Sequence, residues 1–154
     1  VLSVPDGDSL VVKLDGGRQE RIRLIGVDAP ELEQKPWGER ARRFTRTMAL
    51  RRRAVIEPGA EPRDKHGRLL AYVFVQGRMV NEELLRNGLA VLFTIPPNSR
   101  YAGRLAAVEQ AARAAGIGIW DPRNGLKELP GERRRKKTSS GAAVFHHRVS
   151  MEIL

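Results

Sequence analysis

Residues 9–27 have the pattern of a β-hairpin, and this pattern constrains the fold more than any other part of the chain. The run 9–14 is rich in β-branched and aliphatic residues, and Asp15-Gly16-Gly17 is a hairpin-turn signal. In the returning run, arginines alternate with Ile22 and Leu24, so one face of the strand is predicted to be buried and the other to face solvent. We therefore predict two antiparallel strands.

The second strand ends in Asp28-Ala29-Pro30-Glu31, which brings two acids to one place. Pro30 stops the strand because proline has no N–H for the ladder and disfavours helix at the residue before it. Acids in this position are usually turn or capping residues, and a functional role is the alternative. Two other turns contain similar groups, Asp6-Gly7-Asp8 and Asp64-Lys65-His66-Gly67-Arg68, and Arg23 lies on the strand between the first two acidic turns. Their occurrence in one chain favours a common site.

Beyond this hairpin, short strands alternate with helices. Strands are predicted over residues 54–57, 69–75 and 89–95, and a loop over 58–64. Helices are predicted over residues 39–52, 79–87 and 101–115, the last of them capped by Asn98 or Ser99 and ended by Gly116. About five short strands in antiparallel meanders with three helices predict a β-barrel with helices of the α+β class, the architecture of an OB-fold.

The net charge of +10, from 28 Lys and Arg against 18 Asp and Glu, predicts attraction to polyanions. Nucleic acid and an anionic membrane surface are both polyanions, and solubility alone is the simpler explanation. The arginines of the helix predicted over 39–52 are interpreted as a solvated face, with nucleic-acid contact as the alternative. The chain has no cysteine, so a metal would need oxygen or histidine ligands.

The length of 154 residues predicts one ordinary domain, over residues 1–121. Residues 122–154 are predicted to form a basic C-terminal tail that is flexible or loosely packed, because apolar residues become rare and residues 133–137 are all arginine or lysine. No apolar run approaches the roughly 20 residues of a membrane span, so no membrane attachment is predicted.

The order and spacing of the motifs resemble those of the staphylococcal nuclease (thermonuclease) family from about residue 1 to residue 120. The motifs are Asp6-Gly7-Asp8-Ser9, Arg23-Leu24-Ile25-Gly26-Val27-Asp28-Ala29-Pro30-Glu31, Asp64-Lys65-His66-Gly67-Arg68-Leu69-Leu70-Ala71-Tyr72, Met79-Val80-Asn81-Glu82 and Gly88-Leu89-Ala90. This resemblance implies a five-stranded OB-fold barrel with three α-helices. It also implies a secreted or exported enzyme that cleaves DNA and RNA with Ca²⁺ and leaves 3′-phosphates.

The resemblance assigns a role to each residue of the predicted site. The implied ligands of Ca²⁺ are the side chains of Asp8 and Asp28 and the backbone carbonyl of Ala29. Glu31 matches the carboxylate that acts on the attacking water, either by taking its proton or by orienting it. Arg23 and Arg68 match the two guanidinium groups that grip the phosphate. Calcium prefers hard oxygen donors, and the planar fork of arginine matches two phosphate oxygens, so the residue types suit these roles.

The expected partners are DNA and RNA, with single strands preferred, and the protein is expected to be a monomer. The main rival hypothesis is a catalytically inactive OB-fold module that binds nucleic acid or a protein. Retention of the three acids and two arginines argues against this rival. A membrane-surface protein anchored by the basic run at 133–137 is less favoured, because no amphipathic helix or lipidation signal accompanies that run.

Overall fold

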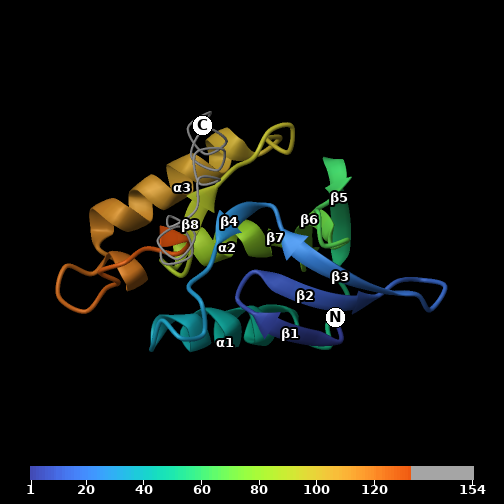
Figure 1. Ribbon diagram of the computed structural model, residues 1–154, viewed down its shortest axis with the longest axis horizontal. Helices are drawn as coiled ribbons and strands as arrows, with labels where there is room; N and C mark the ends of the chain where they lie inside the picture. The colour runs from blue at the N-terminus through green and yellow to red at the C-terminus, as the bar shows by residue number, and fades with distance from the viewer. Residues whose placement is uncertain (133–154) are drawn as a thin grey trace.

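The computed structural model describes residues 1–132, which form eight strands and three α-helices (Figure 1). The strands are β1 (Ser3–Asp6), β2 (Ser9–Lys13), β3 (Gln19–Leu24), β4 (Gly26–Asp28), β5 (Val55–Arg63), β6 (Leu69–Val75), β7 (Arg78–Met79) and β8 (Val91–Phe93). The helices are α1 (Trp37–Ala49), α2 (Val80–Arg86) and α3 (Ala102–Ala115), and a short 3₁₀ helix, η1 (Gly118–Trp120), follows α3.

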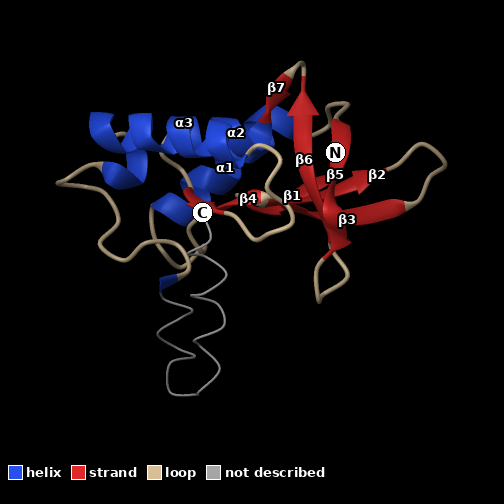
Figure 2. Cartoon of the chain, turned by 90° about the horizontal axis from the view of Figure 1, so that it is seen from above, coloured by secondary structure: helices blue, strands red, loops and turns tan. Residues whose placement is uncertain are grey.

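The larger sheet has the strand order β1-β2-β3-β6-β5, with β7 paired to β6, and β4 pairs separately with β8. The predicted hairpin is confirmed, since β2 and β3 are antiparallel with Leu10 opposite Ile22. Figure 2 shows the helices gathered on one side of the molecule and most strands on the other. The predicted α+β fold class, with three helices and a sheet-rich core, is confirmed.

The prediction of antiparallel meanders is wrong for β3 and β6, which pair in parallel with Ile22 opposite Leu69. Between these strands the chain passes through β4, α1 and β5, and such a long connection can return the chain in the same direction. The alternation in β3 is as predicted. Ile22 and Leu24 are buried in the core, Arg21 is exposed and Arg23 is partly exposed.

Several element boundaries differ from the predictions. Helix α1 begins at Trp37 and ends at Ala49, so the arginines at 51–53 follow the helix. Strand β5 continues through the predicted loop 58–64 as far as Arg63. Two prolines are tolerated there because β5 is the edge strand of the sheet and has a register shift after Pro58. Strand β8 is shorter than the predicted strand over 89–95.

The predicted capping of α3 by Asn98 or Ser99 is wrong, because Tyr101 occupies the N-cap position and no side chain caps the helix. The Asn98 side chain instead exchanges two hydrogen bonds of 2.8 Å with the backbone of Glu61. Asn98 therefore ties the loop before α3 to β5. Gly116 ends α3 in a left-handed conformation, as predicted.

The first part of the predicted tail, residues 122–132, contacts the region where α1 begins. Gln34 Nε2 donates a hydrogen bond to the carbonyl of Glu128 at 2.8 Å, and Trp37 Nε1 donates to the carbonyl of Asn124 at 3.1 Å. Leu129 packs against the core. The other predicted tail residues, 133–154, lie outside the described residues, and the domain boundary at 121 stays a prediction. No helix within residues 1–132 has the length and apolar character of a membrane span.

Asn81, on α2, fixes the bend between β3 and β4. Its side chain is fully buried, and its Nδ2 donates a hydrogen bond to the carbonyl of Ile25 at 2.8 Å. Its Oδ1 accepts a hydrogen bond from the backbone N–H of Val73 in β6 at 3.1 Å. Ile25 is the residue between β3 and β4, so Asn81 links the bend to the neighbouring strand.

We expect Asn81→Ala to lower the free energy of unfolding by about 2–6 kcal/mol, because two buried backbone groups lose their partner at about 1–3 kcal/mol each. Urea denaturation followed by circular dichroism measures this loss. Asn87→Ala is the matched control, since the exposed Asn87 amide donates to the carbonyl of Glu83 and to no other group within residues 1–132. A loss for Asn81→Ala no greater than that for the control would contradict the assigned role.

Candidate active site

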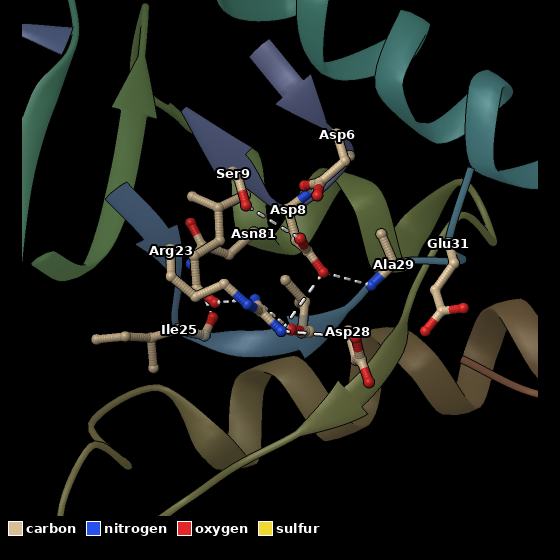
Figure 3. Close-up of polar contacts among 12 residues, drawn as sticks. Asp6, Asp8, Ser9, Arg23, Ile25, Asp28, Ala29, Glu31 and Asn81 are labelled. Carbon is tan, nitrogen blue, oxygen red and sulfur yellow. Dashed lines mark hydrogen bonds and ion pairs between the residues drawn. The ribbon is translucent and has the colours of Figure 1, made fainter. Parts of the chain in front are cut away.

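Two buried carboxylates meet at one arginine. Asp8 lies in the turn between β1 and β2, Asp28 ends β4, and Arg23 lies on β3 between them in the sequence. Arg23 Nη2 is 3.4 Å from Asp8 Oδ2 and 3.6 Å from Asp28 Oδ1 (Figure 3). Asp8 is 7% exposed and Asp28 is 2% exposed. The structure thus brings together three of the predicted site residues, which we call the Asp8–Arg23–Asp28 group.

Backbone atoms fix this group in one orientation. Arg23 Nη1 donates to the carbonyls of Leu24 and Val27 at 2.7 and 2.8 Å. Asp8 Oδ2 accepts a hydrogen bond of 2.8 Å from the backbone N–H of Ala29. These bonds join the turn before β2 to the residues that follow β4. The side chains are therefore held in place by the fold, as a preorganised site requires.

The turn that positions Asp8 fits closely against α1. The carbonyl of Gly7 accepts a hydrogen bond of 2.7 Å from the buried hydroxyl of Thr45. A Cβ atom at Gly7 would lie 2.7 Å from the Ala41 Cβ and 3.0 Å from the Ala29 Cβ. The turn therefore needs glycine because any larger residue would push α1 and Ala29 apart.

Asp6, in the same turn, has an unusual proton affinity. Burial and then the negative charge of Asp8 raise the pKa of Asp6 to about 6. Its Oδ1 also accepts a hydrogen bond of 3.3 Å from the backbone N–H of Asp8. Asp6 therefore gains a proton at a pH at which ordinary carboxylates are still ionised.

Glu31 lies beside Ala29, with its carboxylate on the Asp28 side (Figure 3). Its backbone N–H donates to Gln34 Oε1 at 2.9 Å, and its carbonyl accepts from the backbone N–H of Gln34 at 2.8 Å. The structure thus places Glu31 next to the group, in a turn that Gln34 holds.

Arg68, which precedes β6, forms no hydrogen bond or ion pair with the Asp8–Arg23–Asp28 group in the part of the chain described. Its Nε donates to Asp64 Oδ2 at 2.8 Å. Although burial acts to raise the pKa of Asp64, the hydrogen bonds from Arg68 hold that pKa below its usual value. Leu70 of β6 is opposite Arg23, and Arg68 comes directly before β6, so the chain brings Arg68 near the strand that carries Arg23.

The oxygen atoms of the group suit a hard cation. Residues 1–132 contain no cluster of three or more His, Asp or Glu side chains that could hold a metal. The candidate donor set is smaller, comprising the carboxylates of Asp8 and Asp28 and the neighbouring carbonyl of Ala29. Such a set fits Ca²⁺, which accepts carboxylate and carbonyl oxygens and completes its shell with water. It does not fit metals that prefer sulfur or imidazole ligands.

The amino-acid sequence matches a known protein family. A family model described as "Staphylococcal nuclease homologue" matches residues 21–122, which is more than half of the chain. The chain belongs to the staphylococcal nuclease family. The resemblance seen in the motifs is therefore confirmed.

Three similar proteins of this family illustrate the relationship. The thermonuclease of Staphylococcus intermedius is 37% identical over 126 residues, which cover 79% of this chain and 74% of the relative. The thermonuclease of Staphylococcus hyicus is 34% identical over 125 residues, which cover 78% of this chain and 73% of the relative. Endonuclease YncB of Bacillus subtilis (strain 168) is 35% identical over 122 residues, covering 75% of this chain and 57% of the relative.

The sequence did not reveal the supporting roles of Asp6 and Thr45. Asp6 stands in the same turn motif as Asp8, and the pair of acids was the available signal of an electrostatic interaction. The role of Thr45 depends on its hydrogen bond to Gly7, which joins residues 38 positions apart. No local pattern predicts such a contact.

We expect Gly7→Ala to destabilise the protein by about 1–3 kcal/mol, the usual cost of overpacking, and to disturb the turn that positions Asp8. Gly103→Ala is the matched control, since a Cβ at this position on α3 meets no atom within 4 Å. Denaturation curves measure both variants. The control is expected to be neutral or slightly stabilising, because alanine favours helix over glycine. Equal stability of the two variants would contradict the close fit at Gly7.

Proposed function

We propose that this protein is a Ca²⁺-dependent, sugar-nonspecific endonuclease that hydrolyses phosphodiester bonds in DNA and RNA and leaves 3′-phosphates. The observation that supports this most strongly is the convergence of Asp8, Arg23 and Asp28 at one buried point. Relatives named thermonuclease and endonuclease support a nuclease activity. The net charge of +10 supports a polyanionic substrate.

Asp8, Asp28 and the carbonyl of Ala29 are the residues that would hold the ion. When bound, Ca²⁺ supplies a positive charge that polarises a phosphate oxygen of the substrate. Arg23 Nη2 faces both carboxylates. In the proposed reaction this nitrogen would donate hydrogen bonds to the phosphate.

Glu31 is the proposed partner of the attacking water, whose proton it accepts or whose orientation it fixes. The water oxygen bonds to phosphorus, and the bond from phosphorus to the 5′ oxygen breaks. The 5′ oxygen leaves as a hydroxyl once it has taken up the proton that the water gives up, either from Glu31 or through solvent, and the phosphate stays on the 3′ side. Arg23 stabilises the extra negative charge of the pentacoordinate state.

Arg68 is the proposed second phosphate ligand. Its ion pair with Asp64 uses Nε, and within residues 1–132 no hydrogen bond engages its two terminal nitrogens. A guanidinium has five N–H donors, so Arg68 can keep Asp64 as a partner while its terminal nitrogens donate to a phosphate. Asp64 then orients Arg68. The predicted single-strand preference, monomeric state and export stay predictions.

Digestion of single-stranded DNA by wild type and Glu31→Ala, with Ca²⁺ and with a chelator, tests the proposal. Wild type is expected to cleave only with Ca²⁺, and its products are expected to carry 3′-phosphates detectable by mass spectrometry. Glu31→Ala is expected to lower kcat by about 10²–10⁴-fold, the usual contribution of a general base, with little change in KM. Glu33→Ala is the matched control, because Glu33 is an exposed carboxylate two residues away.

Two results would contradict the proposal. If folded wild-type protein bound DNA but did not cleave it with Ca²⁺, the protein would be the inactive binding module. If Glu31→Ala lost no more activity than Glu33→Ala, the assigned role of Glu31 would be wrong.

A further inference from the structure

Most of the net positive charge is concentrated in and around α1. Residues 34–56 contain eight of the 28 basic residues but only one of the 18 acidic residues, Glu39. This segment therefore accounts for most of the net charge of +10. Because opposite charges do not balance it, the segment attracts anions more strongly than an evenly mixed surface would.

Three of these arginines form an exposed face of α1, which we call the α1 basic face (Arg40, Arg43 and Arg46). In the described part of the chain, none of the three forms an ion pair with a carboxylate, and Glu39 pairs with Arg42 at 3.5 Å. Like charges at three-residue spacing on a helix repel one another. The α1 basic face therefore weakens the helix, and an anionic partner would offset this repulsion.

A hollow of about 510 Å³ opens at the first turn of α1, beside this face. It is lined by Leu32, Lys35, Pro36, Glu39, Arg40 and Arg43. Leu32 is 41% exposed, so the hollow presents apolar atoms to solvent as well as cationic groups. The guanidinium carbon of Arg40 lies 4.8 Å from the centre of the Trp37 ring, and this contact holds Arg40 at the edge of the hollow. Apolar atoms beside arginine and lysine are the combination that contacts both a base and a phosphate.

The hollow lies next to the proposed active site along the chain. Leu32 directly follows Glu31, and the turn held by Gln34 leads from Glu31 into α1. A nucleic-acid strand that places one phosphate at Arg23 and passes Glu31 would next meet the hollow. The α1 basic face then continues along the helix.

We propose that the hollow and the α1 basic face bind the substrate strand beyond the phosphodiester bond that is cleaved. This inference rests on the proposed nuclease function. Arg40 and Arg43 contact phosphates, and Leu32 and Pro36 contact a base. Contacts of this kind do not depend on base sequence, so they increase the affinity for long strands without selecting a sequence.

The test compares Arg40→Gln/Arg43→Gln with a control that also loses two positive charges, Arg18→Gln/Arg113→Gln. Arg18 and Arg113 lie on the β2–β3 hairpin and on α3, away from α1 (Figure 1). The probe is a long fluorescein-labelled oligothymidylate, and its fluorescence anisotropy is measured in chelator so that no cleavage occurs. The Arg40/Arg43 variant is expected to bind at least fivefold more weakly than the control. Its plot of log affinity against log salt is expected to be less steep by about 1.4, which is about 0.7 for each lost phosphate contact.

Cleavage with Ca²⁺ gives a second measurement. The Arg40/Arg43 variant is expected to show a raised KM and an unchanged kcat on the long strand. It is expected to cleave a dinucleotide as the control does, because a dinucleotide has no phosphodiester beyond the cleaved bond for these arginines to contact. Glutamine favours helix nearly as well as arginine and both positions are exposed, so the variant is expected to fold. Thermal denaturation checks this.

If both double variants bind the oligothymidylate with the same affinity and salt dependence, the inference is overturned. Binding to phosphatidylserine vesicles is measured in the same way. If the Arg40/Arg43 variant binds these vesicles more weakly than the control but binds the oligothymidylate as the control does, the inference is also overturned, and the face would bind a membrane instead. If wild type fails to cleave while the difference in oligothymidylate binding is present, the nuclease function fails and the strand-binding face is supported.

Discussion

The ion-paired arrangement of Arg23 with Asp8 and Asp28 is the interaction on which the rest of the structure depends. Two carboxylates in a buried place repel each other, and each also loses favourable contact with water. Arg23 offsets both costs, provided that its guanidinium stays between them. The carbonyls of Leu24 and Val27 hold it there. Burying these three charged side chains lowers the stability of the fold unless the surrounding residues hold all three in place. The site therefore depends on the fold around it.

Each neighbouring feature helps to fix that arrangement. The β2–β3 hairpin brings Asp8 next to Arg23, since Ser9 is opposite Arg23 in the register. Asn81 holds the bend after β3. Strand β4 follows this bend and ends at Asp28. Thr45 holds the turn of Gly7 against α1. Residues that contact no substrate thus determine where the charged groups lie, and the raised pKa of Asp6 is a further consequence of gathering acids in one buried turn.

The sequence predicted the features that depend on neighbouring residues. The alternation of arginine with Ile22 and Leu24 indicated which face of β3 is buried, and the glycines at 16 and 17 indicated the hairpin. The motifs also indicated which residues form the candidate site. Distant contacts were not predictable, because no local period encodes them. The parallel pairing of β3 with β6 is one such contact, and the bond of Asn98 to Glu61 is another.

Calorimetric titration of Ca²⁺ tests most directly whether Asp8, Arg23 and Asp28 form a metal-dependent catalytic centre. The comparison is between wild type, Asp28→Asn, and Asp15→Asn as a control at an exposed acid in the β2–β3 turn. Asp28→Asn removes the charge of one donor and nearly preserves its shape. Wild type and Asp15→Asn are expected to bind Ca²⁺ alike, and Asp28→Asn at least tenfold more weakly. Equal affinity in all three proteins, or no binding by folded wild type, would contradict a metal site at this group.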